Sequence, residues 1–349
     1  MGMGILDVLK LTPSSSLVNA TAMVSPWTEG QLSTIVWSDV LGTDAVVPVT
    51  RAEAMRIPAV AKARNLIAAT IMRLPLVAMR GGDRLPDADQ PTWMYRTDGS
   101  VSPQMRNVWT IDDMLFYGAS LWSVTRGADG TILTGERIPW DWWTITPDGA
   151  ILVHNEAVKA RDVLYFPSHT DPLLEAAATT IRAARDVNES VARRAASPVP
   201  VMEIHQNETD TPLSNDEAKA LVTAYNAARR DPEGATVFTP SHITLNPHGD
   251  RADSGALTEA RNASRLDIAN HTGLPASMLE GTSAAASLTY VTTDGKRSEL
   301  IEYGVLPWVT SFEARLSMDD VVARGLRSAL DLDVLIATQQ SATGAERQD

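Results

Sequence analysis

The chain has 349 residues, of which 44% are hydrophobic and 21% are charged, and it contains no cysteine. These proportions are typical of a globular protein with more than one packed unit, and they exclude disulfides and thiolate metal sites. A formal net charge of -13 argues against tight nucleic-acid binding over the general surface, because phosphates are neutralised by cations. Solubility is the simplest reason for an acidic surface. Without a long apolar run or a signal-peptide pattern, we expect a soluble protein that is not exported and has no membrane contact.

The first part of the chain is predicted to be an arm followed by a helix. Residues 1–50 are rich in Ser, Thr, Pro and Val and show no lasting period, so we expect an N-terminal arm that needs a partner to order it. Thr50 and Glu53 are spaced as a capping box, and the apolar stripe that follows Pro58 continues at helical spacing until Pro75. This pattern predicts a helix with one buried face.

Hairpins dominate the next part of the chain. A short helix is predicted over 111–118, with Thr110 and Asp113 marking its cap. Asp-Gly turns at 127–130 and 147–149 lie between alternating apolar residues, which is a strong hairpin signal. Together these elements predict an α+β unit.

Three tryptophans lie close together in this unit. Trp140, Trp142 and Trp143 are predicted to share one strand region, so that the first two lie on one face and the third on the other. Burial on both sides is the simpler interpretation, and a contact between subunits is the alternative.

Two long helices bracket a small module. The first is predicted to start at the N-cap Asp171 and to run to about residue 196, and the second spans 254–272 and ends at Gly273. The module between them reads as strands around a capped helix that begins at Ser214. We therefore expect two antiparallel legs with a compact foot.

A small-residue loop follows the second leg. Its residues are neither apolar enough for a core nor equipped for chemistry: Thr282, Ser283, Ala284, Ala285, Ala286 and Ser287. The segment 288–316 then reads as one long helix, in which we expect a kink near Gly304 and Pro307, because proline cannot donate to the preceding turn. A further helix is predicted over 321–330, before a disordered tail.

No catalytic, metal-binding or cofactor-binding constellation emerges from the sequence. The segment 294–298 (DGKRS) lacks the first glycine of a phosphate-binding loop and lies inside a predicted helix, so a solvated helix face is the simpler interpretation. Paired carboxylates at Asp112-Asp113 and Asp319-Asp320 are predicted to favour the positive ends of helices. The histidines show no metal-binding spacing: His154, His169, His205, His242, His248 and His271.

Five short motifs, taken in order, carry a resemblance to a known family. They are IMRLPL at 71–76, YGAS at 117–120, DVLYF at 162–166, GLP at 273–275 and LPW at 306–308. The chain resembles the portal proteins of tailed bacteriophages, which are ring subunits at one capsid vertex. The resemblance implies a ring, usually of twelve subunits, through whose channel double-stranded DNA is packaged and ejected.

The resemblance also implies named parts, places and partners. The parts are an N-terminal arm (1–50), a wing (51–170), stem helix 1 (171–197), a clip (198–250), stem helix 2 (251–280), a tunnel loop (281–287), a long kinked helix (288–317) and a short crown remnant with a tail (318–349). The implied partners are the terminase large subunit, a head-completion or adaptor protein and the major capsid protein. Assembly would take place in the host cytoplasm, and the ring would be part of the virion.

Charge suggests how such a channel would work. Sliding DNA needs a surface without dense cations, which the small tunnel-loop residues provide. Acidic residues are expected to meet a partner of the clip: Glu203, Glu208, Asp210, Asp216 and Glu217. Four arginines of stem helix 1 either face DNA or, as we favour, pair with acids of a neighbouring subunit: Arg182, Arg185, Arg193 and Arg194. Another head–tail connector or adaptor ring is the alternative function, and a nuclease or hydrolase lacks its constellation.

Overall fold

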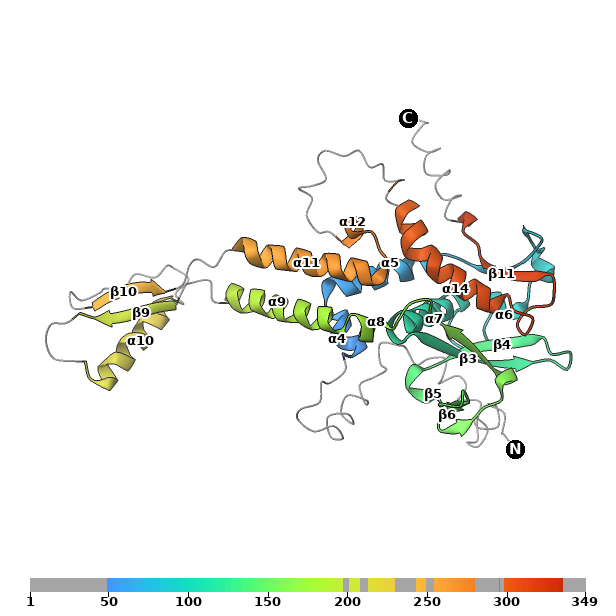
Figure 1. The fold of residues 1–349 in the computed structure, drawn as a ribbon, viewed down its shortest axis with the longest axis horizontal. Helices are drawn as coiled ribbons and strands as arrows, with labels where there is room; N and C mark the ends of the chain where they lie inside the picture. The colour runs from blue at the N-terminus through green and yellow to red at the C-terminus, as the bar shows by residue number, and fades with distance from the viewer. Residues whose placement is uncertain are drawn as a thin grey trace, which may run out of the picture. The chain divides into compact units, whose positions relative to one another are not determined.

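The chain divides into two compact units. The computed structural model describes residues 49–196, 201–207, 213–229, 243–248, 254–279, 295 and 298–334. Unit 1 comprises the residues up to Arg185 and those from Asn262 onward, and unit 2 spans Asp186–Arg261. Both units combine helix and sheet (Figure 1), which confirms the predicted α+β class.

Helices of unit 1 lie on both sides of the unit 2 segment in the sequence. They are α4 (Arg51–Met55), α5 (Pro58–Ile71), α6 (Thr92–Tyr95), α7 (Pro103–Tyr117), α8 (Leu173–Ala176), α12 (Ala276–Leu279), the π-helical segment η5 (Leu300–Val305) and α14 (Leu306–Leu316), with 3₁₀ turns η1 (Asp87–Asp89), η2 (Trp140–Trp142) and η3 (Ala160–Asp162). Two longer helices cross between the units: α9 (Ala178–Ala196) and α11 (Ser254–Thr272). Unit 2 contains α10 (Asn215–Arg229).

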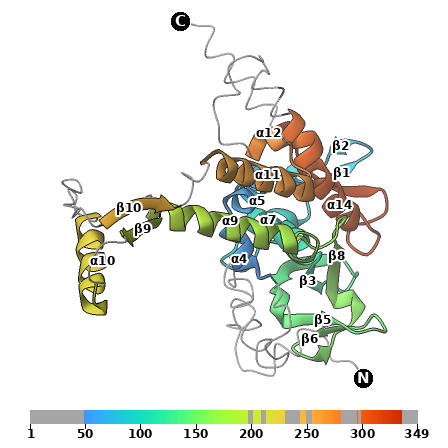
Figure 2. The same ribbon diagram turned by 60° about the vertical axis from the view of Figure 1, so that its left-hand side comes forward.

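The strands form small antiparallel sheets. Unit 1 holds three of them among the described residues, in the orders β11-β1-β2, β4-β3-β8 and β5-β6-β7 (Figure 2), and unit 2 holds the pair β10-β9. Their strands are β1 (Leu76–Arg80), β2 (Asp83–Arg84), β3 (Ala119–Arg126), β4 (Ile132–Ile138), β5 (Trp143–Ile145), β6 (Ile151–Val153), β7 (Glu156–Ala157), β8 (Val163–Pro167), β9 (Val201–Gln206), β10 (Ile243–His248) and β11 (Leu326–Leu330).

The capping box before α4 is confirmed, and the helix it starts is interrupted. The Thr50 hydroxyl accepts from the Glu53 N–H at 3.2 Å, and the Glu53 carboxylate accepts from the Thr50 N–H at 3.0 Å. Helix α4 ends before Ile57, and α5 restarts at Pro58, whose ring disfavours a helical conformation in the residue before it. The buried stripe of α5 includes Ile67 and Ile71.

Helix α7 is the central element of unit 1, and it is longer than predicted. It begins after Ser102, whose hydroxyl accepts from the Met105 N–H at 3.2 Å, and ends at Gly118, which adopts a left-handed φ of 82°. The predicted start at Thr110 is wrong because Thr110 lies in mid-helix. Its hydroxyl donates to the Arg106 carbonyl at 2.8 Å and accepts from the Trp122 indole at 2.7 Å.

The carboxylates of Asp112 and Asp113 are buried in mid-helix, not placed at a helix start as predicted. Asp112 accepts from Arg51 at 2.9 Å and also pairs with Arg64, so two arginines share one carboxylate. Asp113 accepts two hydrogen bonds from Arg137, at 2.6 and 2.7 Å. Charges this deeply buried are stable only when paired, so these contacts tie α4, α5 and β4 to α7.

A fourth arginine of this core is held by aromatic rings. Arg106 lies over Trp122 at 4.2 Å and donates to the carbonyls of Gly135 at 2.6 Å and Trp93 at 3.1 Å. Burial lowers the pKa of Arg106 to about 9, and the nearby Glu136 opposes that shift. The side chain therefore stays charged at neutral pH.

An aromatic cluster joins β3, β8 and α14. The Trp122 ring lies 4.8 Å from Phe166 and 5.9 Å from Phe312, and the two phenylalanine rings stack 5.4 Å apart. All three side chains are fully buried, and truncating a buried aromatic residue to alanine typically costs 3–5 kcal/mol. This cluster anchors α14 to the sheet.

The C-terminal helix predicted over 321–330 is wrong. Residues Leu326–Leu330 form strand β11, which pairs antiparallel with β1 from Leu76↔Leu330 to Arg80↔Leu326. Asp319 and Asp320 lie in the turn between α14 and β11, where they pair with Arg324 and Arg315, and do not begin a helix. The predicted helix lost to a strand partner that is distant in sequence.

Helix α14 also caps the free edges of two sheets. On one side, Ser311 and Arg315 donate to the β8 carbonyls of Pro167 and Tyr165. On the other, the carboxylate of Glu313 accepts from the β11 N–H of Leu330 at 2.6 Å. Covered edges cannot pair with another chain, so these two edges are closed to strand addition.

The carboxyl of Glu313 makes stability depend on pH. Burial raises its pKa above the ordinary value, although the Leu330 hydrogen bond opposes that rise. The folded state therefore favours the protonated form, and this contribution is present below the ordinary pKa and lost as the pH rises through the raised value. Glu313→Gln keeps an acceptor oxygen and stays neutral, so we expect its Tm to exceed that of the parent by about 2 °C at pH 7 and by nearly nothing at pH 4.

A carboxyl with the opposite shift provides the control. Hydrogen bonds from Thr131 lower the pKa of the exposed Asp129, so its stabilising contribution is present above the ordinary pKa. Asp129→Asn should therefore lower the Tm at pH 7, and by less as the pH falls below the ordinary pKa of the carboxyl, as measured by thermal melts over this range. A Glu313→Gln advantage that did not shrink on acidification would contradict the assignment.

Two further predictions of local structure are corrected. The helix predicted from Asp171 is broken in two. Helix α8 ends at Ala176, the next residue Ala177 has a non-helical φ of -99° and ψ of 11°, and α9 starts after it. The cap residue of α8 is Pro172 and not Asp171. The three tryptophans do not share a strand either, since η2 contains Trp140 and Trp142 and only Trp143 begins β5.

Candidate channel and docking segments

Unit 2 has the order of elements predicted for the module between the legs. Strand β9 pairs antiparallel with β10, from Val201↔His248 to Gln206↔Ile243, and α10 lies between them in the sequence. The strand predicted around 235–240 lies outside the described residues. Helix α11 spans Ser254–Thr272, as predicted, and Gly273 ends it with a left-handed φ of 68°.

The acidic residues predicted to bind a partner differ in how engaged they are. Glu203 on β9 is exposed and accepts from Asn246 at 3.4 Å, and Asp216 is exposed in the first turn of α10. Glu217 is engaged within its own helix end, since its carboxylate accepts from the Ser214 hydroxyl and N–H at 2.8 and 2.9 Å. Hydrogen bonds from Ser214 also lower the pKa of Glu217. Glu208 and Asp210 lie outside the described residues.

The Glu217 contact completes a capping box. The Ser214 hydroxyl accepts from the Glu217 N–H at 3.3 Å. Two N–H groups that the helix start would leave without an acceptor, those of Ser214 and Glu217, are therefore satisfied. The predicted cap is confirmed, and it gives Glu217 a local structural task.

The kink predicted at Gly304 and Pro307 coincides with a π-helical turn. Segment η5 precedes Pro307, and the N–H of Leu306 donates to the carbonyl of Ile301, five residues back. Proline has no N–H for the preceding turn, and π-helical turns are a known way for a helix to absorb such a mismatch. The remainder of the predicted long helix, 288–294 and 296–297, lies outside the described residues.

The turn after α11 fits closely against this segment. A Cβ atom added to Gly304 would lie 2.3 Å from Cδ2 of Leu274, a residue that is only 4% exposed. The backbone on either side is also tightly specified, because Gly273 adopts its left-handed φ beside the carbonyl of Tyr303. Gly304 is therefore required for the approach of the two segments that flank residues 280–294.

The predicted tunnel loop, 281–287, lies within that flanked segment and outside the described residues. The expectation that the α9 arginines pair with acids of a neighbouring subunit, and do not face DNA, also stays a prediction. Arg182 is half-buried, Arg185 and Arg193 are exposed, and the side chain of Arg194 is outside the described part.

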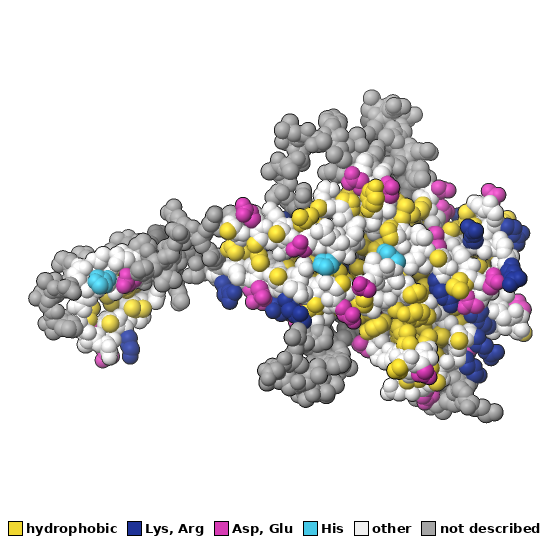
Figure 3. All heavy atoms as spheres, viewed as in Figure 1, with side chains coloured by type: hydrophobic (Ala, Val, Ile, Leu, Met, Phe, Trp, Pro, Cys, Tyr) yellow, Lys and Arg dark blue, Asp and Glu magenta, His cyan; other side chains and the backbone are white. Residues whose placement is uncertain are grey.

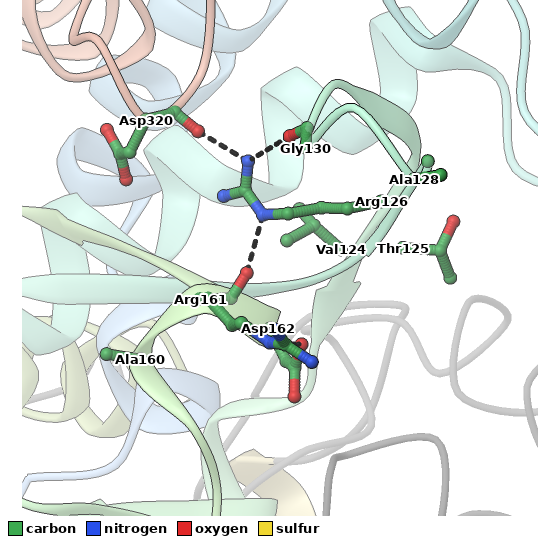
Figure 4. Close-up of a pocket in the computed structure, with 10 residues that line it drawn as sticks. Val124, Thr125, Arg126, Ala128, Gly130, Ala160, Arg161, Asp162 and Asp320 are labelled. Carbon is green, nitrogen blue, oxygen red and sulfur yellow. Dashed lines mark hydrogen bonds and ion pairs between the residues drawn. The ribbon is translucent and has the colours of Figure 1, made fainter.

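No pattern in the sequence indicated the arginine that joins three loops beside a hollow of about 690 Å³. Figure 4 shows the guanidinium of Arg126 donating to the carbonyls of Gly130 at 3.1 Å, Asp320 at 2.6 Å and Arg161 at 2.7 Å. These acceptors belong to the β3–β4 turn, the turn after α14 and η3. Because the guanidinium is engaged with the chain's own backbone, its arrangement is that of a clamp between loops.

Neither a metal-binding cluster nor a membrane-spanning helix is present in the described part of the chain. There, no group of three or more His, Asp or Glu side chains is placed to hold a metal ion. None of the described helices combines the length and the apolar character needed to span a bilayer.

The comparisons with known proteins assign the family. The profile of the family described as phage portal protein matches residues 58–347. The chain belongs to the phage portal protein family. A solved structure of an HK97-family phage portal protein from Corynebacterium diphtheriae is 30% identical, with a TM-score of 0.64, and the match covers 82% of this chain and 97% of that one.

More distant portal-like structures share the fold. A chain in the virion of a native gene transfer agent particle is 16% identical, and a chain in the neck of that particle, computed with C12 symmetry, is 14% identical. Both matches have a TM-score of 0.60 and cover 91% of this chain and 95% of the other. The comparison with curated proteins found no match.

Proposed function

We propose that this chain is the subunit of a portal ring at one capsid vertex, through whose channel double-stranded DNA is packaged and ejected. The observation that carries this proposal is the family match over residues 58–347, together with a 30% identical portal protein that the chain covers almost completely. The gene transfer agent necks, computed with C12 and C6 symmetry, support a ring. We favour twelve copies, located in the virion after assembly in the host cytoplasm.

The named parts of a portal subunit fit the order of the described elements. We assign the wing to 51–170, the two stem helices to the segments of α9 and α11, and the clip to 198–250. Helices α9 and α11 flank the β9, α10 and β10 elements in the sequence, which supports a stem with a clip at its end. We assign fewer residues to the crown than the expected 318–349, because strand β11 within that range pairs with β1 in unit 1.

The docking partners follow from charge. We propose that the clip binds the terminase large subunit and a head-completion or adaptor protein, and that the ring contacts the major capsid protein. Among the described residues, Glu203 and Asp216 are both exposed, and we propose both for docking, whereas Glu217 caps α10. Complementary charge would speed the encounter and set its orientation.

The tunnel loop would form a channel surface that DNA slides past. Its alanines, serines and threonine offer no cation to phosphates, and each phosphate contact would add affinity by releasing counterions. A sliding surface needs the opposite property, which is weak contact at every register of the DNA.

Adding positive charge to the loop tests this role. Replacing Ala284, Ala285 and Ala286 with lysine should shorten the DNA packaged in a reconstituted assay, and the defect should shrink as salt rises. The matched control replaces the same three residues with glutamine, which adds comparable bulk without charge. Equal DNA length in the lysine and parent rings would contradict the constriction role, and equal defects in both variants would assign the effect to bulk.

A further inference from the structure

An aromatic patch lies where α7 ends and β5 begins. We define it as Tyr117, Trp140, Trp142, Trp143 and Tyr165. Tyr117 stacks on Trp140 at 4.8 Å, Trp140 meets Trp143 edge-on at 4.9 Å, and Trp143 meets Tyr165 at 6.1 Å. Four of these five side chains are only half-buried, and hydrophobic side chains gather over the β5 region (Figure 3). A contiguous apolar surface of this kind marks an interaction site.

The patch borders a sheet edge that remains open. Strand β5 is the terminal strand of the β5-β6-β7 sheet among the described residues. The carbonyl of Trp142 and the N–H of Thr146 bond towards β6, so the intervening alternation directs the backbone groups of Trp143 and Ile145 away from β6. The side chain of Ile145 is 45% exposed. An edge strand of this kind favours pairing with another strand.

The chain enters the described structure beside this patch. Val49 is buried, and two residues later the guanidinium of Arg51 lies 5.0 Å from the centre of the Phe116 ring. Tyr117, the residue after Phe116, stacks on Trp140. The start of α4 and the aromatic patch therefore both contact the last turn of α7.

The sequence before Val49 contains a segment suited to that edge. Ser33–Trp37 reads STIVW, the densest run of β-branched and aromatic residues within 1–48, and such residues favour strands. Residues 38–48 connect it to Val49, and at roughly 3.3 Å per residue they span up to about 36 Å, which exceeds the length of about 22 Å of the whole 15-residue helix α7.

We propose that Ser33–Trp37 of the same chain adds to the open edge of β5 as an outer strand and covers the aromatic patch. Backbone hydrogen bonds to Trp143 and Ile145 supply the pairing, and apolar side chains of the added strand cover the half-buried rings. This proposal does not depend on the proposed role as a DNA channel.

Cross-linking in the full-length chain tests the proposal, and the absence of native cysteine makes it clean. Thr34→Cys combined with Ile145→Cys should give a cross-linked monomer of altered gel mobility with a short bis-maleimide. The matched control combines Thr34→Cys with Leu133→Cys, because Leu133 is 55% exposed on β4 and should give at most a trace of product.

Each other outcome overturns the proposal. A ladder of cross-linked dimers and higher species would show that a neighbouring copy supplies the strand, and product no greater than the Leu133 control would show that the segment docks elsewhere. Hydrogen exchange needs no variant: the Ile145 amide should exchange at least about tenfold more slowly than that of a free chain, and unprotected exchange in the parent would equally contradict strand addition.

Discussion

Replacing Asp112 with asparagine is expected to lower the free energy of unfolding of unit 1 by about 3–5 kcal/mol. The change removes the one carboxylate that Arg51 and Arg64 share, and its side chain is 1% exposed. Two guanidinium groups would remain buried without their counter-charge, and neither can reach water without opening the contact between α4, α5 and α7. Loss of one partner costs far more than the net value of the pair, because the desolvation of the remaining charge is no longer compensated.

Urea unfolding followed by tryptophan fluorescence measures this effect, with a midpoint expected to fall by roughly 1–2 M. The control is Asp87→Asn, which breaks the exposed pair between Arg84 and Asp87 and should change stability by under about 0.5 kcal/mol. A loss below about 1 kcal/mol for Asp112→Asn would show that the two arginines find other acceptors and that the shared pair does not hold the core.

The Asp112 contacts illustrate what the sequence could not predict. Each aspartate of the adjacent pair binds arginines that are far away in the sequence, at Arg51, Arg64 and Arg137. An adjacent carboxylate pair reads locally as a helix start, and only the packing of α4, α5 and β4 around α7 shows otherwise. Strand β11 was missed for the same reason, because its helical-looking sequence is overruled by pairing with β1.

Local signals predicted what local physics controls. The capping boxes at Thr50 and Ser214, the hairpin turn before Gly130 and the left-handed Gly273 depend on residues within a few positions of one another. The kink was predicted at Pro307 because proline removes a donor, but the sequence did not predict the π-helical turn before it or the close approach of Leu274 to Gly304. The candidate docking acids were predicted from charge, although the capping box predicted at Ser214 already engages one of them, Glu217, with its own helix.

The contact between Gly304 and Leu274 is expected to behave as a coupled pair. Gly304→Ala should cost about 1–3 kcal/mol, because its Cβ would lie 2.3 Å from Cδ2 of Leu274 and that buried side chain has no solvent to move into. Leu274→Ala alone should cost about 2–5 kcal/mol by leaving a cavity. In the double variant the added methyl group enters that cavity. The stability loss of the double variant should therefore be smaller than the sum of the two single losses by about 0.5–3 kcal/mol.

Urea unfolding of the four proteins closes this cycle, and Tyr303→Ala is the matched control. Tyr303 lies on the same π-helical turn with its side chain 59% exposed, so its loss should change stability by under about 0.5 kcal/mol. Additive losses would show that η5 can move away from Leu274. In that case the contact would not fix the spacing of the two segments that lead into the proposed tunnel loop. A coupled pair would mean that this spacing is set in the folded subunit, before any DNA enters the proposed channel.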